Sequence, residues 1–178
     1  MENKTLTIGC RIPKNFFETK GIGSSLIAEH SGSYHKALKM AGIEMSNIMT
    51  YSSILPKIAN LIQKPEIITH GCVLESIMAV SHGRINELCT AGIIYGWLYD
   101  KETGEKFGGL VCEHNGRKKE NDIINDLKSS LDELYYNGFS EKYEMKDIHY
   151  IVESFIGTEE YNTSLVALCF IDYEVPIL

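Results

Sequence analysis

The sequence predicts a single α+β domain in which strands outnumber helices. Apolar runs of strand length recur along the chain, at 70–80, 90–99, 147–155 and 164–173. The clearest helical periodicity spans 121–137, and its packed face is expected to hold Ile124, Leu127, Leu131, Leu134 and Tyr135. Because the strands follow one another instead of alternating with helices, we expect layered, mostly antiparallel sheets and not a doubly wound parallel sheet.

Composition agrees with one globular domain over residues 1–178. Of the 178 residues, 44% are hydrophobic and 23% are charged, which suffices to bury a core. The 17 Lys and Arg against 24 Asp and Glu give a net charge of -7, so we expect no nucleic-acid partner. The five cysteines are scattered, and the N-terminus lacks the basic start of a signal peptide. No apolar run approaches the about 20 residues of a membrane span. We therefore expect a reduced, cytoplasmic protein without a membrane partner.

The first part of the chain is expected to be rich in strands. Residues 5–12 and 22–29 are predicted strands joined by a loop. A short helix is predicted over 34–41, with Ser33 as its N-cap and Gly42 where helices commonly end. The buried face of this helix would hold Ala37, Leu38 and Ala41.

The middle of the chain contains a strand with a sharp end and a hairpin. Residues 46–55 are a predicted strand that Pro56 ends, because the residue before a proline is forced toward extended geometry. The polar run 100–105 separates the apolar run before it from a predicted strand at 107–114, as in a β-hairpin. Glu113 is therefore expected near a strand end.

The pair Ser52-Ser53 is the most informative feature for function. Two other Ser-Ser pairs, at 24–25 and 129–130, fall in a predicted loop and in the long predicted helix. Only Ser52-Ser53 has a predicted strand before it and a proline-restrained exit after it. The alternative interpretation is an ordinary strand end.

Residues 41–57 resemble the self-cleavage region of pyruvoyl-dependent arginine decarboxylases, where a Ser-Ser or Thr-Ser bond precedes an apolar pair and a proline. Here these residues read Ser52-Ser53-Ile54-Leu55-Pro56. The similarity continues in 33–43, in Thr69-His70-Gly71-Cys72-Val73-Leu74-Glu75, and in Gly108-Gly109-Leu110-Val111-Cys112-Glu113. It covers most of the chain and is weak at both ends.

The resemblance implies an αββα four-layer sandwich and self-cleavage into a β chain, 1–52, and an α chain, 53–178. It also implies a homotrimer or hexamer of cleaved protomers with active sites between subunits. The covalent pyruvoyl group would derive from Ser53 after its hydroxyl attacks the Ser52 carbonyl. A substrate amine then forms a Schiff base with the pyruvoyl ketone, which accepts electrons as carbon dioxide departs, and arginine is converted to agmatine.

The resemblance assigns further roles to Asn47 and Glu113. A serine hydroxyl is a weak nucleophile, so its attack needs oxyanion stabilisation, for which Asn47 is the candidate donor. Glu113 matches the acid that returns a proton to the substrate, and burial would favour its protonated form. The alternative interpretations are a turn residue for Asn47 and a solvated residue for Glu113.

His35 departs from the family pattern, which has an aspartate facing the guanidinium at this helix position. An imidazole does not clamp a guanidinium as a carboxylate does. Either Glu44 or Glu29 takes this role, or the substrate is another amino acid. Leu38 and Ile54 would still supply an apolar wall to the substrate site.

Two further functions remain as alternatives. One is a homologue without processing that acts as a binding or regulatory protein. The other is a metal-dependent protein that uses His70, Cys72 and His82. Because these spacings match no tight zinc-ligand pair, core cysteines and capping histidines are favoured and we expect no metal.

Overall fold

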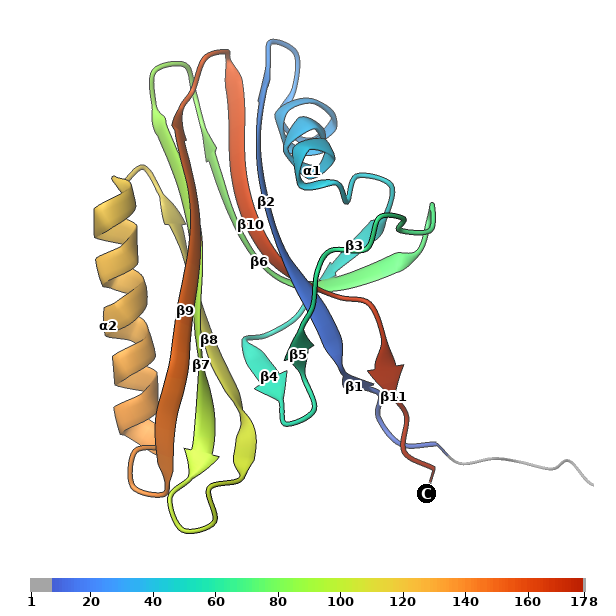
Figure 1. Ribbon diagram of the computed structural model, residues 1–178. Helices are drawn as coiled ribbons and strands as arrows, with labels where there is room; N and C mark the ends of the chain where they lie inside the picture. Colours follow the sequence, from blue (N-terminus) through green and yellow to red (C-terminus); the bar gives the residue numbers. More distant parts are fainter. Residues whose placement is uncertain (1–7, 178) are drawn as a thin grey trace, which may run out of the picture.

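Two β-sheets built from distant parts of the chain form the framework of the computed structural model, which describes residues 8–177 (Figure 1). The five-stranded sheet has the order β3 (Asn47–Thr50), β6 (Val73–Gly83), β10 (Tyr161–Phe170), β2 (Asn15–Ser25) and β5 (Asn60–Leu61). The four-stranded sheet has the order β4 (Ile54–Pro56), β8 (Lys106–Gly116), β7 (Leu88–Asp100) and β9 (Tyr143–Ile156). A two-stranded ribbon pairs β1 (Ile12–Pro13) with β11 (Tyr173–Glu174).

The strand pairing confirms the α+β prediction. All pairs in the four-stranded sheet are antiparallel. In the five-stranded sheet the central pairs β10–β2 and β10–β6 are antiparallel, whereas β3–β6 and β2–β5 are parallel. The five-stranded sheet is therefore mixed, and its parallel pairs lie at its two edges.

The long helix α2 (Glu120–Gly138) packs against the four-stranded sheet (Figure 1). Its buried residues are Ile123, Leu127 and Leu131, spaced four apart on one face. The predicted helix is confirmed within a residue at each end. Leu134 was wrongly expected on the packed face, since it is 38% exposed, whereas the expected Ile124 and Tyr135 are partly buried against the sheet.

The inter-sheet core joins the inward faces of both sheets. Phe16, Ile77 and Leu168 come from the five-stranded sheet, and Ile93 and Val111 come from the four-stranded sheet. All five are at most 1% exposed. Because burial of apolar surface contributes about 25 cal/mol per Å², this core fixes one sheet against the other.

The short helix α1 (His35–Ala41) lies against β2 on the five-stranded sheet. Its predicted buried residues Ala37, Leu38 and Ala41 are confirmed. Gly42 ends the helix in the left-handed region, at φ 71°, as predicted. The helix and strand approach so closely that a Cβ at Gly21 would lie 2.2 Å from the Ala37 carbonyl oxygen.

Several predicted boundaries at the start of the chain were wrong. Residues 5–7 of the first predicted strand lie outside the described residues. The loop predicted between the first two strands was wrong, because β2 runs from Asn15 to Ser25 and covers most of it, and the strand predicted at 22–29 ends at Ser25. The following segment forms the π-helix η1 (Glu29–Tyr34). Ser33 is no N-cap, because it lies in η1, where its hydroxyl contacts the Thr163 hydroxyl at 2.9 Å.

The remaining predicted strands are confirmed with small shifts, except the strand at 46–55. It is divided into β3 and β4, which belong to different sheets. Glu113 lies inside β8 and not at its end. Within residues 8–177, no helix combines the length and the apolar character needed to cross a bilayer.

We expect the Gly21→Ala substitution to lower the free energy of unfolding by about 1–3 kcal/mol or more, because the added methyl group collides with the backbone of α1. Urea unfolding followed by circular dichroism measures this change. Gly138→Ala is the matched control, since a Cβ there meets nothing within 4 Å. Equal stability of the two variants would contradict the close packing of α1 on β2.

Candidate active site

The Ser52-Ser53 peptide lies where the backbone passes from one sheet to the other. Residues 51–53 connect β3 of the five-stranded sheet to β4 of the four-stranded sheet. The Tyr51 N–H donates to the Ser76 carbonyl at 2.8 Å, and the Val111 N–H donates to the Ser53 carbonyl at 3.2 Å. The two sides of the Ser52-Ser53 peptide are thus attached to different sheets.

The Ser53 hydroxyl faces the carboxylate of Glu113. Its Oγ lies 2.7 Å from Oε1 and 2.7 Å from Oε2, and both side chains are half-buried. Alternate residues of a strand share one face, so Glu113 lies on the face of β8 that carries Val111 into the inter-sheet core. A carboxylate on such a face contacting a serine hydroxyl is an arrangement that can accept a proton from a nucleophile.

The carbonyl group of Ser52 also has a donor close to it. The Ile54 N–H donates to the Ser52 carbonyl oxygen at 3.0 Å, which closes a three-residue turn around Ser53. A backbone N–H at this position is the kind of donor that stabilises an oxyanion on the same oxygen. Ser52 itself is exposed, and the side chain of Ile54 is 67% exposed.

An open hollow of about 520 Å³ lies beside Ser52. Its walls include Arg11, Tyr51 and Glu75. Glu75 is only 2% exposed, accepts a hydrogen bond from the Tyr51 hydroxyl and forms an ion pair with Arg11. Burial, followed by the contact with Glu75, raises the pKa of Tyr51.

Asn47 lies at the first position of β3 and is exposed. Its side-chain amide donates to the Gly71 carbonyl at 3.0 Å, and its backbone N–H donates to the Cys72 carbonyl at 2.8 Å. The described contacts of Asn47 are therefore with the turn before β6 and not with the Ser52-Ser53 peptide. Its predicted role as an oxyanion donor stays a prediction.

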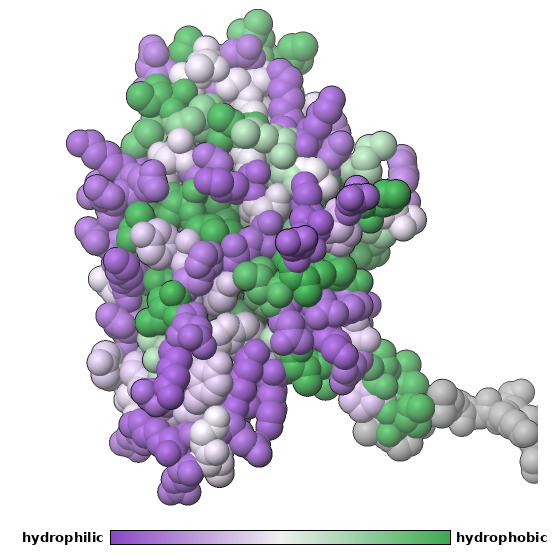
Figure 2. Space-filling view, in the orientation of Figure 1, coloured by the Kyte–Doolittle hydropathy of each residue, from purple (hydrophilic) through white to green (hydrophobic). Residues whose placement is uncertain are grey.

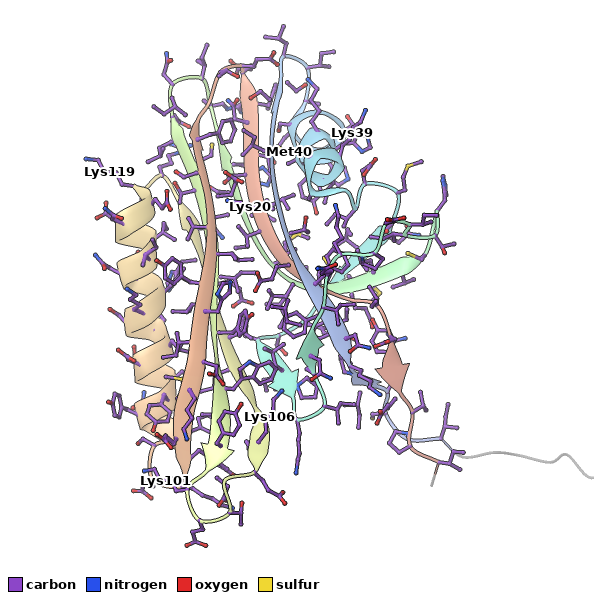
Figure 3. All side chains as sticks on the ribbon, viewed as in Figure 1. Lys20, Lys39, Met40, Lys101, Lys106 and Lys119 are labelled. Atoms are coloured by element: carbon purple, nitrogen blue, oxygen red, sulfur yellow. The ribbon has the colours of Figure 1, made fainter. Side chains whose placement is uncertain are left out.

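The predicted substrate-contacting residues of α1 lie apart from Ser53 within one chain. His35 and Leu38 line a hollow with His30, Ser31 and Tyr34, which shares no residue with the hollow beside Ser52. In Figure 3, the labelled Lys39 and Met40 mark α1, and the labelled Lys106 marks the start of β8, which pairs with β4. The two labelled regions lie well apart in this view. One protomer alone does not bring the two groups together.

The two carboxylates considered as replacements at the substrate site differ in their surroundings. Glu29 lines a hollow with His30, Tyr34 and His82, and its Oε1 lies 3.9 Å from His82 Nε2. Glu44 is half-buried in the turn after α1. Glu29 is thus a residue of η1 that lines a hollow together with His30 and Tyr34.

A metal site has no support among the described residues. Within 8–177, no group of three or more His, Cys, Asp or Glu side chains is arranged to hold a metal ion. His82 contacts the Thr163 hydroxyl through Nδ1 at 2.9 Å, and the Cys72 thiol contacts the Ser46 hydroxyl at 3.4 Å. These two residues therefore have hydrogen-bonding roles in the fold.

Sequence reasoning missed two components of this region. The Ile54 N–H is a backbone group, so no side-chain pattern announces it. The Arg11–Glu75–Tyr51 cluster had one signal, a glutamate inside the apolar run of β6. A charge in such a run indicates either an exposed edge or a buried partner, and here it is a buried partner.

The chain is similar in sequence to a known family of decarboxylases. The family model described as Pyruvoyl-dependent arginine decarboxylase (PvlArgDC) matches residues 15–175. The chain is 31% identical to the Pyruvoyl-dependent arginine decarboxylase AaxB of Chlamydia abortus, over 93% of this chain and 94% of that protein. It is 29% identical to the protein of the same name from Chlamydia pneumoniae, over 95% and 96%, and 31% identical to the Pyruvoyl-dependent arginine decarboxylase of Picrophilus torridus, over 58% and 56%.

The neighbour of Glu113 offers a test of the local electrostatics. Burial, followed by the charge of Glu113, raises the pKa of the Cys112 thiol to about 11. At pH 8 we expect Cys112 to react with iodoacetamide roughly 10²-fold more slowly than an unperturbed thiol, because thiolate is the reactive form. Glu113→Gln should accelerate labelling of Cys112, which peptide mass spectrometry quantifies against the exposed Cys10 as internal control. Unchanged labelling would contradict an effect of the Glu113 side chain on the Cys112 thiol.

Proposed function

The chain belongs to the pyruvoyl-dependent arginine decarboxylase family, whose members are carboxy-lyases, and on this premise we propose that it cleaves itself at Ser52-Ser53. We propose further that Ser53 becomes the pyruvoyl group and that the mature enzyme converts arginine to agmatine and carbon dioxide. The observation that carries this proposal is the Ser53 hydroxyl, 2.7 Å from both oxygens of Glu113, at the crossover between the sheets.

Self-cleavage begins with the Ser53 hydroxyl. Its Oγ attacks the carbonyl carbon of Ser52 as its proton passes to Glu113, and the Ile54 N–H stabilises the oxyanion. The C–N bond then breaks as the departing nitrogen takes that proton from Glu113, leaving an ester between Ser52 and the side chain of residue 53, which now has a free amino group. Removal of the Cα proton of residue 53 breaks the Cβ–O bond and releases the Ser52 carboxylate. Water replaces the amino nitrogen with a ketone oxygen, and ammonia departs.

The two fragments are expected to remain together after cleavage. Fragment 1–52 contributes β2, which lies between β10 and β5 of fragment 53–178. It also contributes β3, which pairs with β6. Breaking one peptide bond leaves all of these strand pairs in place, so we propose that the mature protomer keeps the fold described here.

The contacts around residue 53 support Ser53 as the source of the pyruvoyl group. β4 ends in Pro56 and pairs with β8, and the Val111 N–H donates to the Ser53 carbonyl, so residue 53 stays attached after scission. When present, the pyruvoyl ketone supplies an electron sink for decarboxylation. We propose that Glu113, which contacts the Ser53 hydroxyl, holds the proton that the α-carbon of the substrate takes up after carbon dioxide leaves.

Arginine is the proposed substrate because the family and the relatives carry that name. His35 is the reason for the runner-up, decarboxylation of another amino acid. Glu29 supports arginine, because its carboxylate and the ring of Tyr34 line the same hollow and both can contact a cationic side chain. A further alternative is a homologue that remains uncleaved and acts as a binding or regulatory protein.

The assembly is proposed to be a homotrimer or hexamer with active sites between subunits. The separation of His35 and Leu38 from Ser53 within one chain supports sites completed by a neighbour. Apolar side chains around the crossover also remain open, with Met49 52%, Ile54 67% and Val73 54% exposed. Figure 2 shows several hydrophobic patches on the viewed face. In such an assembly, Asn47 would act on a neighbouring site.

We also propose that each protomer is the αββα four-layer sandwich of the family. The packing of α2 on the four-stranded sheet, of α1 on the five-stranded sheet, and of the sheets on each other supports it. A reducing, cytoplasmic setting is proposed as well. It is supported by the five cysteines, all of which lie in the described part of the chain and are free.

Purified wild-type protein is expected to give two fragments, 1–52 and 53–178, and the larger one should carry a ketone and resist Edman degradation. Ser53→Ala should give one chain near 20.0 kDa, because it lacks the attacking hydroxyl. Denaturing gels and intact-mass spectrometry measure both outcomes. Ser129→Ala, an exposed position in α2, is the control and should process normally. A wild-type chain that stays whole would support the uncleaved binding protein.

Glu113→Gln is expected to lower carbon dioxide release by about 10²- to 10⁴-fold per pyruvoyl group, since a general acid contributes that much to rate. Release is measured over a panel of amino acids and normalised to the ketone content of each preparation. Glu105→Gln, an exposed partner of Lys57, is the matched control. A wild-type preference for an amino acid other than arginine would favour the runner-up, and an undiminished Glu113→Gln rate would remove Glu113 from catalysis.

A further inference from the structure

The buried carboxylate of Glu75 is hydrogen-bonded to Tyr51, the residue just before Ser52-Ser53. Glu75 is the third residue of β6, opposite Phe170 at the end of β10, and is 2% exposed. Its Oε2 accepts a hydrogen bond from the hydroxyl of Tyr51, and its Oε1 accepts one from Nη2 of Arg11. Tyr51 also contacts the ring of Phe170, with the ring centroids 5.6 Å apart. Tyr51 is thereby held on both its backbone and its side chain.

Arg11 supplies the positive charge of the hollow beside Ser52. Among the described residues that line this hollow, Arg11 is the one cation and Glu75 the one anion. The Arg11 side chain is 54% exposed, and its guanidinium lies 5.2 Å from the ring centroid of Tyr173. A guanidinium presents five N–H donors, so it can bind a second carboxylate while keeping the first.

Scission changes the charge in this hollow, and this step rests on the proposed function. The precursor has a neutral peptide at Ser52, whereas the products include a carboxylate there. The new anion arises in the hollow that already holds Glu75. Without a shared cation, two carboxylates in one partly enclosed site repel each other and the departure of the Ser52 carboxylate becomes harder.

We propose that Arg11 is the receptor for the Ser52 carboxylate that self-cleavage releases. In the precursor, Arg11 compensates the charge of Glu75. During elimination, the Cα proton of residue 53 passes to a base, for which Glu113 is placed, and the Cβ–O electron pair moves onto the Ser52 carboxylate. Arg11 binds this developing charge and so accelerates the second step of processing, after the ester has formed.

The test follows cleavage in a translation time course with Arg11→Gln and wild type. The variant is expected to accumulate a full-length ester, because elimination is slowed. Mild hydroxylamine cuts esters, so it should divide this material into a 1–52 hydroxamate and a 53–178 chain that begins with an unmodified Ser53. Pyruvoyl formation should slow by about tenfold or more, since loss of one donor to an oxyanion in an enclosed site costs roughly 10²- to 10³-fold and Arg11 is half-exposed.

Two matched variants separate this role from charge compensation. Lys14→Gln removes a cation from the same segment, one that pairs with Glu174 and does not line the hollow, and should process like wild type. In Arg11→Gln/Glu75→Gln the uncompensated Glu75 is also removed, and the ester should still accumulate. If the double variant eliminates at the wild-type rate, Arg11 serves only Glu75 and the proposal is wrong.

The remaining outcomes are equally decisive. Normal pyruvoyl formation in Arg11→Gln overturns the proposal, and so does a stall without hydroxylamine-sensitive ester, which would place Arg11 before the elimination. Thermal unfolding of Arg11→Gln in a Ser53→Ala background measures any loss of stability separately from processing. If the wild-type chain itself stays uncleaved, the proposed function fails first, so the two failures are distinguishable.

Discussion

The passage of the backbone from one sheet to the other at residues 51–53 is the constraint on which the site depends. Each side of this short connection is attached to a different sheet, through Ser76 on one side and Val111 on the other. The inter-sheet core therefore sets the position of the Ser53 hydroxyl relative to Glu113. Because both ends of the connection are hydrogen-bonded to strands, local motion of the backbone changes this contact little.

The site also depends on two carboxylates placed where strands usually carry apolar side chains. Glu113 lies on the inward face of β8 and contacts the Ser53 hydroxyl, whereas Glu75 is buried and accepts a hydrogen bond from Tyr51, two residues before Ser53. Buried charges are costly unless they are paired or hydrogen-bonded. Each carboxylate here has such a partner, which is consistent with selection for chemistry and not for stability alone.

The sequence predicted the fold class and most elements because periodicity reports burial directly. The helix at α2 and the strands from β6 to β10 were placed within a few residues, since their apolar faces span many positions, whereas most of β2 was wrongly expected to be a loop. The division of 46–55 between two sheets was not predictable, because Tyr51 to Ser53 give no break signal as strong as a glycine. The wrong cap at Ser33 has a similar cause, since its hydroxyl contacts Thr163, a residue far along the chain.

At the site, the sequence identified Ser53 and Glu113 through the family resemblance, and the structure brings them into contact. It did not identify Arg11, which comes from the N-terminal segment and meets Glu75 across a long sequence separation. Long-range pairs of this kind depend on tertiary packing. Local pattern contains no information about them.

The position of β2 between β10 and β5 has a consequence for the order of events in the life of the molecule. We propose that β2 takes this place before the bond at Ser52 is cut, because the contact of Ser53 with Glu113 depends on the packed sheets. Residues 1–52 and 53–178, expressed from two separate genes, could assemble through the same strand pairs. Such a complemented protein would begin its second chain with an ordinary amino group, because no upstream carbonyl remains for the hydroxyl to attack.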